Sequence, residues 1–268
     1  MKLSLAFSSC PNDTFMFHAM THGLVDTSGL EFEVEVYDVE QLNHSALKGT
    51  YDISKLSYHG YFNVIDSYRM LDSGSALGWG CGPLLVCAQG NEGIVARDDI
   101  KVAVPGTYTT GALLYSMAFP GKGTQIPMLF SEIEGAVQRG EADMGVLIHE
   151  GRFTYRSKGL ALVRDLGQWW QETTQCPIPL GGIAVRRSLG EEIFCKLERI
   201  LHASIEYAFA HPEASRDFVA SFARELSPDI QKKHIDMFVN DYSLSLGEEG
   251  RRAVDELYSL WKSSGSRK

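Results

Sequence analysis

Two segments of the chain, KGTYDISKLSYHG at residues 48–60 and RGEADMGVLIHEG at residues 139–151, align without a gap at an offset of 91 residues. A glycine, an aspartate, a leucine and a final glycine are identical in the two copies, and each copy opens on a basic residue. Chance similarity between two helix–turn–strand units is the alternative. We favour an internal duplication, which predicts two related halves.

Each copy is preceded by a stretch with helical periodicity, at residues 39–48 and 133–139. The glycine that follows, Gly49 or Gly140, is expected to end that helix in the left-handed conformation, with a basic residue in the last turn. A short apolar run then reads as a buried strand. Both copies are therefore predicted to be helix–turn–strand units.

Polar residues cluster at the carboxyl end of each of these predicted strands. The first copy has Lys55, Ser57 and Tyr58 at this position, and the second has His149 and Glu150. Open α/β sheets bind ligands at the carboxyl ends of their strands. Two such units predict two lobes whose strand ends face each other across a ligand cleft.

Apolar runs of strand length alternate with helical stretches along most of the chain, which is the pattern of a largely parallel α/β sheet. These runs lie at residues 3–7, 32–36, 102–104 and 144–148. From about residue 189 to residue 264 the pattern is almost wholly helical, with Pro212 and Pro228 near two breaks. Together with the duplication, this predicts a two-lobed α/β fold of the periplasmic-binding-protein type II class.

The domain organisation follows from where glycine and proline concentrate. We expect the two crossings between lobes near residues 93–98 and 177–183. The first lobe would then be discontinuous, formed by residues 1–95 and 184–268 with the C-terminal helices packed on it. Residues 96–183 would form the second lobe.

A second similarity between the two predicted halves lies in two loops, each of which joins a predicted strand to a helix N-terminus. Residues 8–14 lead into a helix expected to start near Phe15, and residues 105–110 lead into a helix over 111–117. Helix N-termini present unpaired N–H groups and the positive end of the helix dipole, so both loops could accept an anion. Simple capping by residues such as Asp13, Thr109 and Thr110 is the alternative for each of them taken singly.

Composition narrows the class of partner. The chain has 268 residues, 44% apolar and 22% charged, with a formal net charge of −9 and no run of Lys or Arg. A nucleic-acid surface would need clustered basic residues to neutralise phosphates, so no nucleic-acid partner is expected. A small molecule fits better, because a cleft can present local backbone donors whatever the overall charge.

The opening residues indicate where the protein is located. The apolar run before Cys10 is too short for a signal peptide, and no later stretch predicts a membrane span. We therefore expect a cytoplasmic protein with no membrane partner.

The five cysteines form no Cys-x-x-Cys pair, which predicts reduced thiols rather than a disulfide or zinc framework. Cys10 remains open as a nucleophile, although no base is adjacent in sequence.

No metal site is expected. His18 and His22 are the only histidines at an i, i+4 spacing on a predicted helix, and no carboxylate ligand motif accompanies them. The number of subunits in the assembly stays undetermined at this level.

Several motifs together resemble one known family, and the resemblance covers nearly the whole chain. They are SCPNDTF at 9–15, KLSY at 55–58, GCGPL at 80–84, VPG at 104–106 with Thr109 and Thr110, HEGRFTY at 149–155, DLG at 165–167 before Trp169 and Trp170, and AFAHPE at 208–213. The chain resembles the 1,4-dihydroxy-6-naphthoate synthases of futalosine-type menaquinone biosynthesis.

The resemblance implies a lyase that converts cyclic dehypoxanthinylfutalosine, a carboxylated small molecule, into 1,4-dihydroxy-6-naphthoate and a dihydroxyacetone fragment without a cofactor. It implies that His149 is the proton acceptor. It also implies substrate contacts at Lys55, Leu56, Ser57, Thr109 and Thr110.

The residues themselves are compatible with these roles. An imidazole can take a proton at neutral pH, Lys55 can offset substrate charge, and N–H groups near Thr109 can hold a carboxylate. Asp13 is a candidate second acid–base group, and Tyr58 a further candidate site residue. From position alone, His149 could equally be a strand-end histidine bonded to nearby backbone.

Two other functions use the same architecture. A non-enzymatic solute-binding or sensor protein is one, and the missing export signal speaks against it. The chorismate dehydratase of the same pathway is the other.

Overall fold

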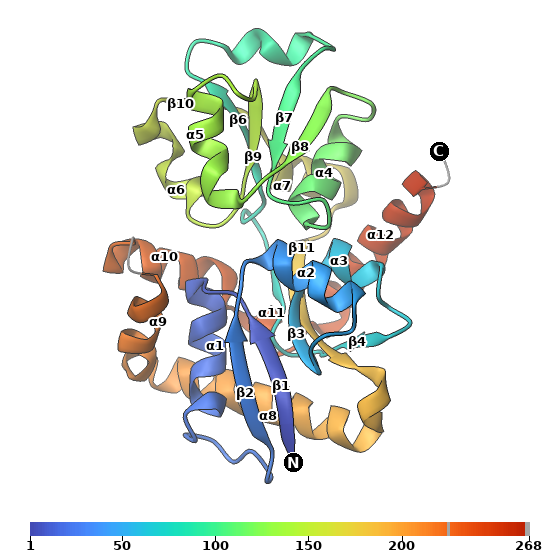
Figure 1. The fold of residues 1–268 in the computed structure, drawn as a ribbon, viewed down its shortest axis with the longest axis vertical. Coiled ribbons are helices and arrows are strands. Elements are labelled where there is room, and N and C mark those ends of the chain that lie inside the picture. Colours follow the sequence, from blue (N-terminus) through green and yellow to red (C-terminus); the bar gives the residue numbers. More distant parts are fainter. Residues whose placement is uncertain (224–225, 266–268) are drawn as a thin grey trace.

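The computed structural model describes residues 1–223 and 226–265, which form two α/β lobes, each built around its own sheet (Figure 1). Within these residues, no helix combines the length and the apolar character needed to cross a bilayer.

The first sheet has six strands in the order β2-β1-β3-β11-β4, with β5 also paired to β11. Its strands are β1 (Lys2–Phe7), β2 (Glu31–Val36), β3 (Ile53–Ser57), β4 (Tyr68–Met70), β5 (Ala76–Gly78) and β11 (Ile178–Arg186). The first lobe carries α1 (Pro11–Thr21), α2 (Val39–Leu47), α3 (Tyr58–Phe62), α8 (Gly190–Ala210), α9 (Arg216–Phe222), α10 (Pro228–Phe238), α11 (Asp241–Leu244) and α12 (Gly247–Gly265).

The second sheet has five strands in the order β10-β6-β9-β7-β8. Its strands are β6 (Leu84–Ala88), β7 (Lys101–Val104), β8 (Thr124–Pro127), β9 (Met144–Leu147) and β10 (Leu160–Asp165). Its helices are α4 (Thr110–Ala118), α5 (Ile133–Gln138), α6 (Gly151–Thr154) and α7 (Leu166–Thr174). Short 3-10 helices lie at Glu92–Ala96, Phe130–Glu132, Tyr155–Lys158, Arg187–Leu189 and Pro212–Ser215.

The predicted repeat is present in three dimensions. Each lobe contains a β-α-β-α-β unit whose strands are parallel and whose first strand lies in the middle, in the orders β2-β1-β3 and β8-β7-β9. Gly49 and Gly140, which close the second helix of each unit, have φ angles of 64° and 71°. Both are in the left-handed region where glycine carries no steric penalty, as the C-cap prediction requires.

An aspartate three residues after each of these glycines makes a similar contact in both units. Asp52 Oδ2 accepts hydrogen bonds from the backbone N–H and hydroxyl of Ser4 on β1, at 3.0 Å each. Asp143 Oδ2 accepts from the backbone N–H of Lys101 on β7 at 2.8 Å. Each aspartate therefore ties the start of the third strand of its unit to the first strand.

The sheets are mixed rather than largely parallel, which corrects the sequence-based expectation. β11 runs antiparallel to β3, β4 and β5, and β6 runs antiparallel to β9 and β10. These are the strands that the chain enters after passing between the lobes. Since the chain then arrives from the opposite end of the sheet, the new strand runs against its neighbours.

The two crossings between the lobes also lie at other positions than expected. β6 pairs in the second sheet, so the first crossing lies between β5 and β6, at residues 79–83 instead of 93–98. The whole of β11 pairs in the first sheet, so the chain returns at residues 175–177. Residues 224–225 and 266–268, assigned to the first lobe from the sequence, lie outside the described residues.

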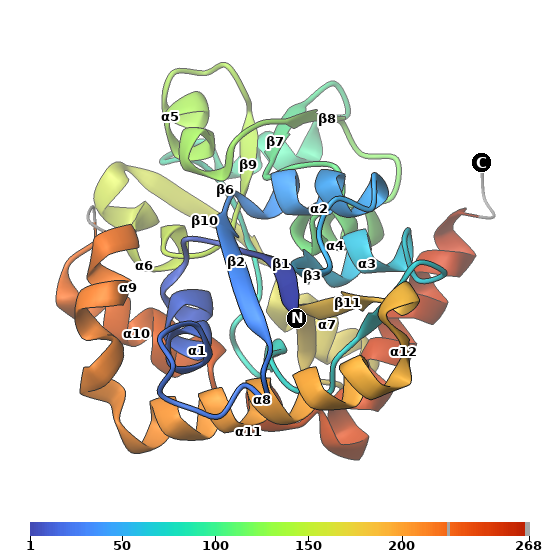
Figure 2. The ribbon, with the colours of Figure 1, turned by 60° about the horizontal axis from the view of Figure 1, so that its bottom comes forward.

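The C-terminal segment is helical, as predicted, and covers the first lobe. Helices α8, α9 and α10 pack against α1, which places them along one side of the first sheet (Figure 2). Apolar side chains of α1 and α8 form a core with β1 and β11, including Met16, Leu5, Ile183 and Leu201. Helix α10, whose first residue is Pro228, is thereby held at the edge that faces the second lobe (Figure 1).

Candidate active site

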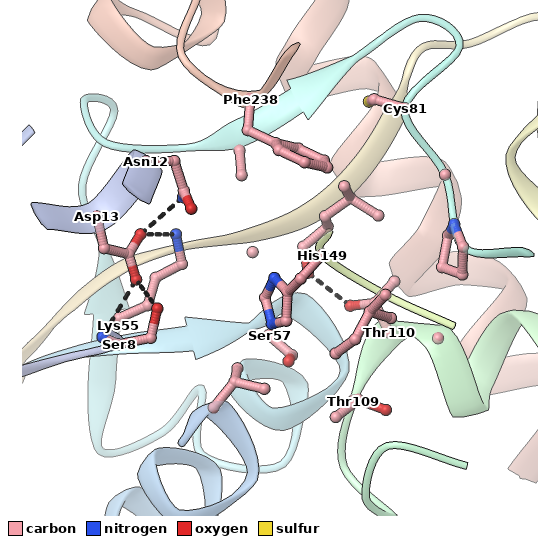
Figure 3. A pocket seen from close by; sticks show the side chains of 18 of the residues that line it. Ser8, Asn12, Asp13, Lys55, Ser57, Cys81, Thr109, Thr110, His149 and Phe238 are labelled. Atoms are coloured by element: carbon pink, nitrogen blue, oxygen red, sulfur yellow. Dashed lines mark hydrogen bonds and ion pairs between the residues drawn. The ribbon is translucent and has the colours of Figure 1, made fainter. Parts of the chain in front are cut away.

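A cavity lies between the lobes, at the carboxyl ends of the central strands. Together with its opening to solvent, it has about 720 Å³ of empty space. The loop and helix start after β1 contribute Ser8, Asn12 and Asp13, and β3 contributes Lys55, Leu56 and Ser57. The second lobe contributes Thr109, Thr110 and Gly111 after β7, and Ile148 and His149 after β9. The four strand ends that the repeat singled out thus meet in one cavity (Figure 3).

On the first-lobe wall, a buried ion pair joins Lys55 to Asp13. The ammonium Nζ of Lys55 lies 2.8 Å from Asp13 Oδ1, and the lysine is only 6% exposed. Asp13 also accepts from the Ser8 hydroxyl at 2.6 Å, the Ser8 N–H at 3.2 Å and the Asn12 amide at 2.9 Å. A buried charge must be paired and hydrogen-bonded, and this carboxylate meets that condition with four donors.

This ion pair changes the interpretation of both residues. The lysine charge is already offset by Asp13, so Lys55 presents an ammonium held in a fixed position rather than an isolated cation. Asp13 lies in the first turn of α1, because that helix begins at Pro11 and not near Phe15. Proline at the first helical position explains the earlier start, since its missing N–H would have no partner there in any case.

Ser57 is held by an amide from the neighbouring helix α2. The Ser57 N–H donates to Asn43 Oδ1 at 3.1 Å, and the Asn43 amide group donates to the Ser57 hydroxyl at 3.3 Å. The hydroxyl is therefore oriented at the cavity wall between Lys55 and the second lobe (Figure 3).

On the second-lobe wall, the N-terminus of α4 opens onto the cavity. Thr109 is its N-cap, with the hydroxyl accepting from the Ala112 N–H at 3.3 Å, so the capping interpretation is correct for this residue. Thr110 does not cap. Its hydroxyl donates to the Leu180 carbonyl on β11 at 2.7 Å, which joins the two lobes. The first N–H groups of a helix lack intrahelical acceptors, so this wall can receive an anion.

His149 follows β9 in a left-handed backbone conformation with φ of 56°, which is uncommon outside glycine. Its ring packs edge-on against Phe130, with centroids 4.9 Å apart, and lies near Cys10 of the first lobe. Burial lowers the pKa of His149 below 6.5, against the raising effect of Glu150, Asp38 and Asp13. The neutral imidazole, which is the form that can accept a proton, is thereby favoured at neutral pH.

Cys10 lies beside this imidazole but lacks the character of a nucleophile. Its Sγ is 3.5 Å from His149 Nδ1. Burial, followed by the charge of Asp13, raises the pKa of the Cys10 thiol far above its usual range. The reactive thiolate is therefore strongly disfavoured, and the sequence-based alternative of a Cys10 nucleophile has no support here.

Tyr58 does not belong to the cavity wall, unlike the three residues before it. Its side chain is 0% exposed and packs in the hydrophobic core, with its hydroxyl 2.8 Å from the Ser75 hydroxyl. The chain turns into α3 at this position, which directs the ring away from the cleft. Seven residues named from the sequence line the cavity: Asp13, Lys55, Leu56, Ser57, Thr109, Thr110 and His149. Cys10 and Glu150 are not part of its lining.

The cavity also contains side chains that were not predicted from the sequence, among them Arg152, His234 and Phe238. Arg152 on α6 bonds the carboxylate of Asp165 at 2.7 Å and the carbonyl of Gly82, so its charge is already paired. His234 and Phe238 come from α10. No local pattern marks the α10 residues, because they reach the cavity only when the C-terminal helices fold back onto α1.

Comparisons with known proteins identify the family of this chain and agree with the fold described above. A family model described as menaquinone biosynthesis matches residues 3–263. A curated relative from Thermus thermophilus, named 1,4-dihydroxy-6-naphthoate synthase, is 44% identical over 98% of this chain and 95% of its own. A relative of the same name from Streptomyces coelicolor is 39% identical over 98% of this chain and 94% of its own.

Solved structures extend the comparison. A protein from Archaeoglobus fulgidus shares 37% identity with a TM-score of 0.91, covering 98% of both chains. The ligand-binding component of an ABC-type import system from Staphylococcus aureus has a TM-score of 0.72 at 12% identity, over 98% of this chain and 91% of its own. The second likeness concerns the fold alone, and it confirms the expected periplasmic-binding-protein fold. Because the family model and both curated relatives span nearly all of its length, the chain belongs to the menaquinone biosynthesis family.

Proposed function

We propose that this protein converts cyclic dehypoxanthinylfutalosine into 1,4-dihydroxy-6-naphthoate, with release of dihydroxyacetone. The observation that carries the proposal is the convergence of His149 with Lys55, Ser57 and the N-terminus of α4 in one cavity between the lobes. The names of the two curated relatives support the same activity. The reaction is a carbon–carbon bond cleavage for which we propose that no cofactor is needed, in the cytoplasm.

Each wall of the cavity has a distinct role in this proposal. The neutral imidazole of His149, the form that burial favours, removes a proton from the substrate. The N–H groups at the start of α4, positioned by the Thr109 cap, bind the substrate carboxylate. Lys55, fixed by Asp13, stabilises negative charge that develops on a substrate oxygen.

The competing function is capture of a small molecule without turnover, which this fold commonly performs. The feature that favours turnover is His149, whose imidazole lines the cavity in the uncharged form that burial favours. A binding protein needs hydrogen-bonding groups in its cleft but has no need of a group placed to accept a proton from its ligand.

The test is turnover by the purified protein. Mixed with cyclic dehypoxanthinylfutalosine and a chelator, with no cofactor added, the protein should release the naphthoate chromophore and dihydroxyacetone. We expect His149→Ala to lower kcat by about 100-fold or more, the typical contribution of a general base, while the melting temperature stays nearly unchanged. Recovery of unchanged substrate would support the binding protein, and dehydration of chorismate would support the related dehydratase. Retention of a tenth of wild-type kcat by His149→Ala would remove His149 from its role.

A further inference from the structure

A second imidazole, that of His234, lies in the wall of the same cavity and has no role in the function proposed above. It is carried by α10 of the C-terminal helical segment, and its side chain is 0% exposed. Its ring centroid lies 5.9 Å from that of His149 and 4.7 Å from that of Phe238 on the next turn of α10.

Both ring nitrogens of His234 lack a hydrogen-bond partner within residues 1–223 and 226–265. Buried polar side-chain atoms nearly always have a partner, so two unpartnered nitrogens on one ring are an exception that requires an explanation. Gln231, three residues earlier on the same buried face of α10, shows the usual case. Its amide donates to the carbonyls of Ala223 and Leu226 at 3.1 and 3.0 Å.

The charges around His234 define which partner it can take. Burial, His149 and Lys55 all lower its pKa well below 6.5. Among the described residues that line the cavity, Asp13 is the only carboxylate, and it is already bonded to Lys55. The ring is therefore neutral at neutral pH, with one N–H donor and one acceptor nitrogen.

A neutral donor–acceptor pair is complementary to a hydroxyl group and poorly suited to a carboxylate, which only accepts hydrogen bonds. We propose that His234 is a substrate-contacting residue, which binds hydroxyl groups of the substrate through its unpartnered ring nitrogens, while the N-terminus of α4 binds the carboxylate. This inference rests on the proposed function, because the substrate considered there carries both kinds of group.

The arrangement also assigns a task to α10. Phe238 covers one side of the His234 ring, and α10 itself packs against α1, so the imidazole is held in place before the substrate arrives. A preorganised contact loses less entropy on binding than a mobile one. Without a ligand hydroxyl, a phenyl ring would fill the same buried position on α10 without leaving polar atoms unpartnered.

Substitution of His234 by phenylalanine therefore tests the inference. In His234→Phe an aromatic ring, although a larger one, is kept and both hydrogen-bonding atoms are removed, whereas His234→Gln keeps one donor and one acceptor. The control is Gln231→Leu, on the same helix face but outside the cavity. KM and kcat for cyclic dehypoxanthinylfutalosine, and the melting temperature, are measured for the wild type and the three variants. The dissociation constant of this compound is also measured in the inactive His149→Ala background, with and without His234→Phe.

We expect His234→Phe to raise KM and the dissociation constant by about tenfold or more, the value of one or two lost hydrogen bonds, without lowering the melting temperature. His234→Gln should recover most of the affinity. Gln231→Leu should lower the melting temperature and leave KM within twofold. A His234→Phe variant with wild-type KM, kcat and affinity would overturn the inference while leaving the proposed function intact. A wild type that neither binds nor converts the compound would overturn both.

Discussion

Two local features distinguish His149, a left-handed backbone and a desolvated ring. The φ of 56° is strained for a residue with a Cβ, and such conformations persist when the surrounding structure holds them. The ring is held between Phe130 of its own lobe and Cys10 of the other. Burial then favours the uncharged imidazole, so one residue combines fixed geometry with the protonation state of a base.

The pH dependence of activity follows from the sign of this pKa shift. Since burial lowers the pKa of His149 below 6.5, the imidazole loses its basic form only when the pH falls below that value. We expect kcat/KM to be flat from about pH 7 to 8 and to fall on acidification below about 6.5, the ordinary histidine pKa. Enzyme incubated at each pH and returned to neutral pH controls for irreversible loss. An acid limb centred above pH 7 would contradict the assignment.

Thr109 allows a second test at the residue scale, because its hydroxyl caps the helix whose N-terminus faces the cavity. Replacing it by valine keeps the shape and removes the cap. We expect Thr109→Val to raise KM by about tenfold and to lower the free energy of unfolding by about 0.5–2 kcal/mol, as other lost N-caps do. Thr109→Ser, which keeps the hydroxyl, should restore both. A KM within twofold of wild type would argue against carboxylate binding at this helix.

At the scale of elements, the repeated β-α-β-α-β unit explains why functional groups occur at equivalent places in both lobes. Parallel strands bring their carboxyl ends to one edge, and the same strand order in both units directs both edges toward the cleft. The left-handed glycine and the aspartate after it set where the third strand of each unit begins. Lys55 and His149 therefore depend for their positions on residues at the opposite end of their strands.

The aspartate contacts can be tested in both units. Asp52→Ala leaves the Ser4 N–H without its partly buried acceptor, so we expect a loss of about 1–3 kcal/mol in the free energy of unfolding. Asp143→Ala should cost less, about 0.5–1.5 kcal/mol, because its bond to Lys101 is exposed to water. Urea unfolding measures both, and asparagine at either site, which keeps an acceptor oxygen, should retain most of the stability. Equal stability of Asp52→Ala and wild type would show that this bond does not position β3.

At the scale of the whole molecule, the lobes are joined by polar contacts beside the cavity. Glu40 of α2 accepts from the backbone N–H of Tyr108 in the second lobe at 3.0 Å, and Asn43 donates to the Tyr108 carbonyl at 3.3 Å. Gly106 allows this approach, because a Cβ at that position would lie 2.3 Å from the Glu40 carboxyl group. Asn43 also holds Ser57, so the contact between lobes and the cavity wall share a residue.

Removing the Glu40 contact should shift the protein toward open arrangements of the lobes. We expect Glu40→Ala to increase the radius of gyration of the unliganded protein in small-angle X-ray scattering. KM should rise severalfold with a smaller change in kcat, because binding affinity falls with the fraction of closed molecules. Saturating substrate should restore the compact form. Scattering curves that superimpose on those of the wild type would show that Glu40 does not hold the lobes together.

Features that depend on local interactions along the chain could be predicted from the sequence. The glycine caps, the capping threonine, the short strands and the repeated unit all depend on residues close in the chain, so their patterns predicted the two-lobed fold and most of the cavity wall. The errors concern the strand direction after each crossing, the crossing positions and the start of α1. Each depends on where a segment arrives from or on a single proline, which hydrophobic periodicity does not record.

Only the tertiary structure decided which distant groups meet. Asp13 pairs with Lys55, Tyr58 turns into the core although its neighbours face the cavity, and His234 enters the site from the C-terminal helices. The physical reason is that burial and pairing are properties of the space around a side chain. That space is formed by segments far apart in sequence, once the core between α1, α8 and the first sheet has packed.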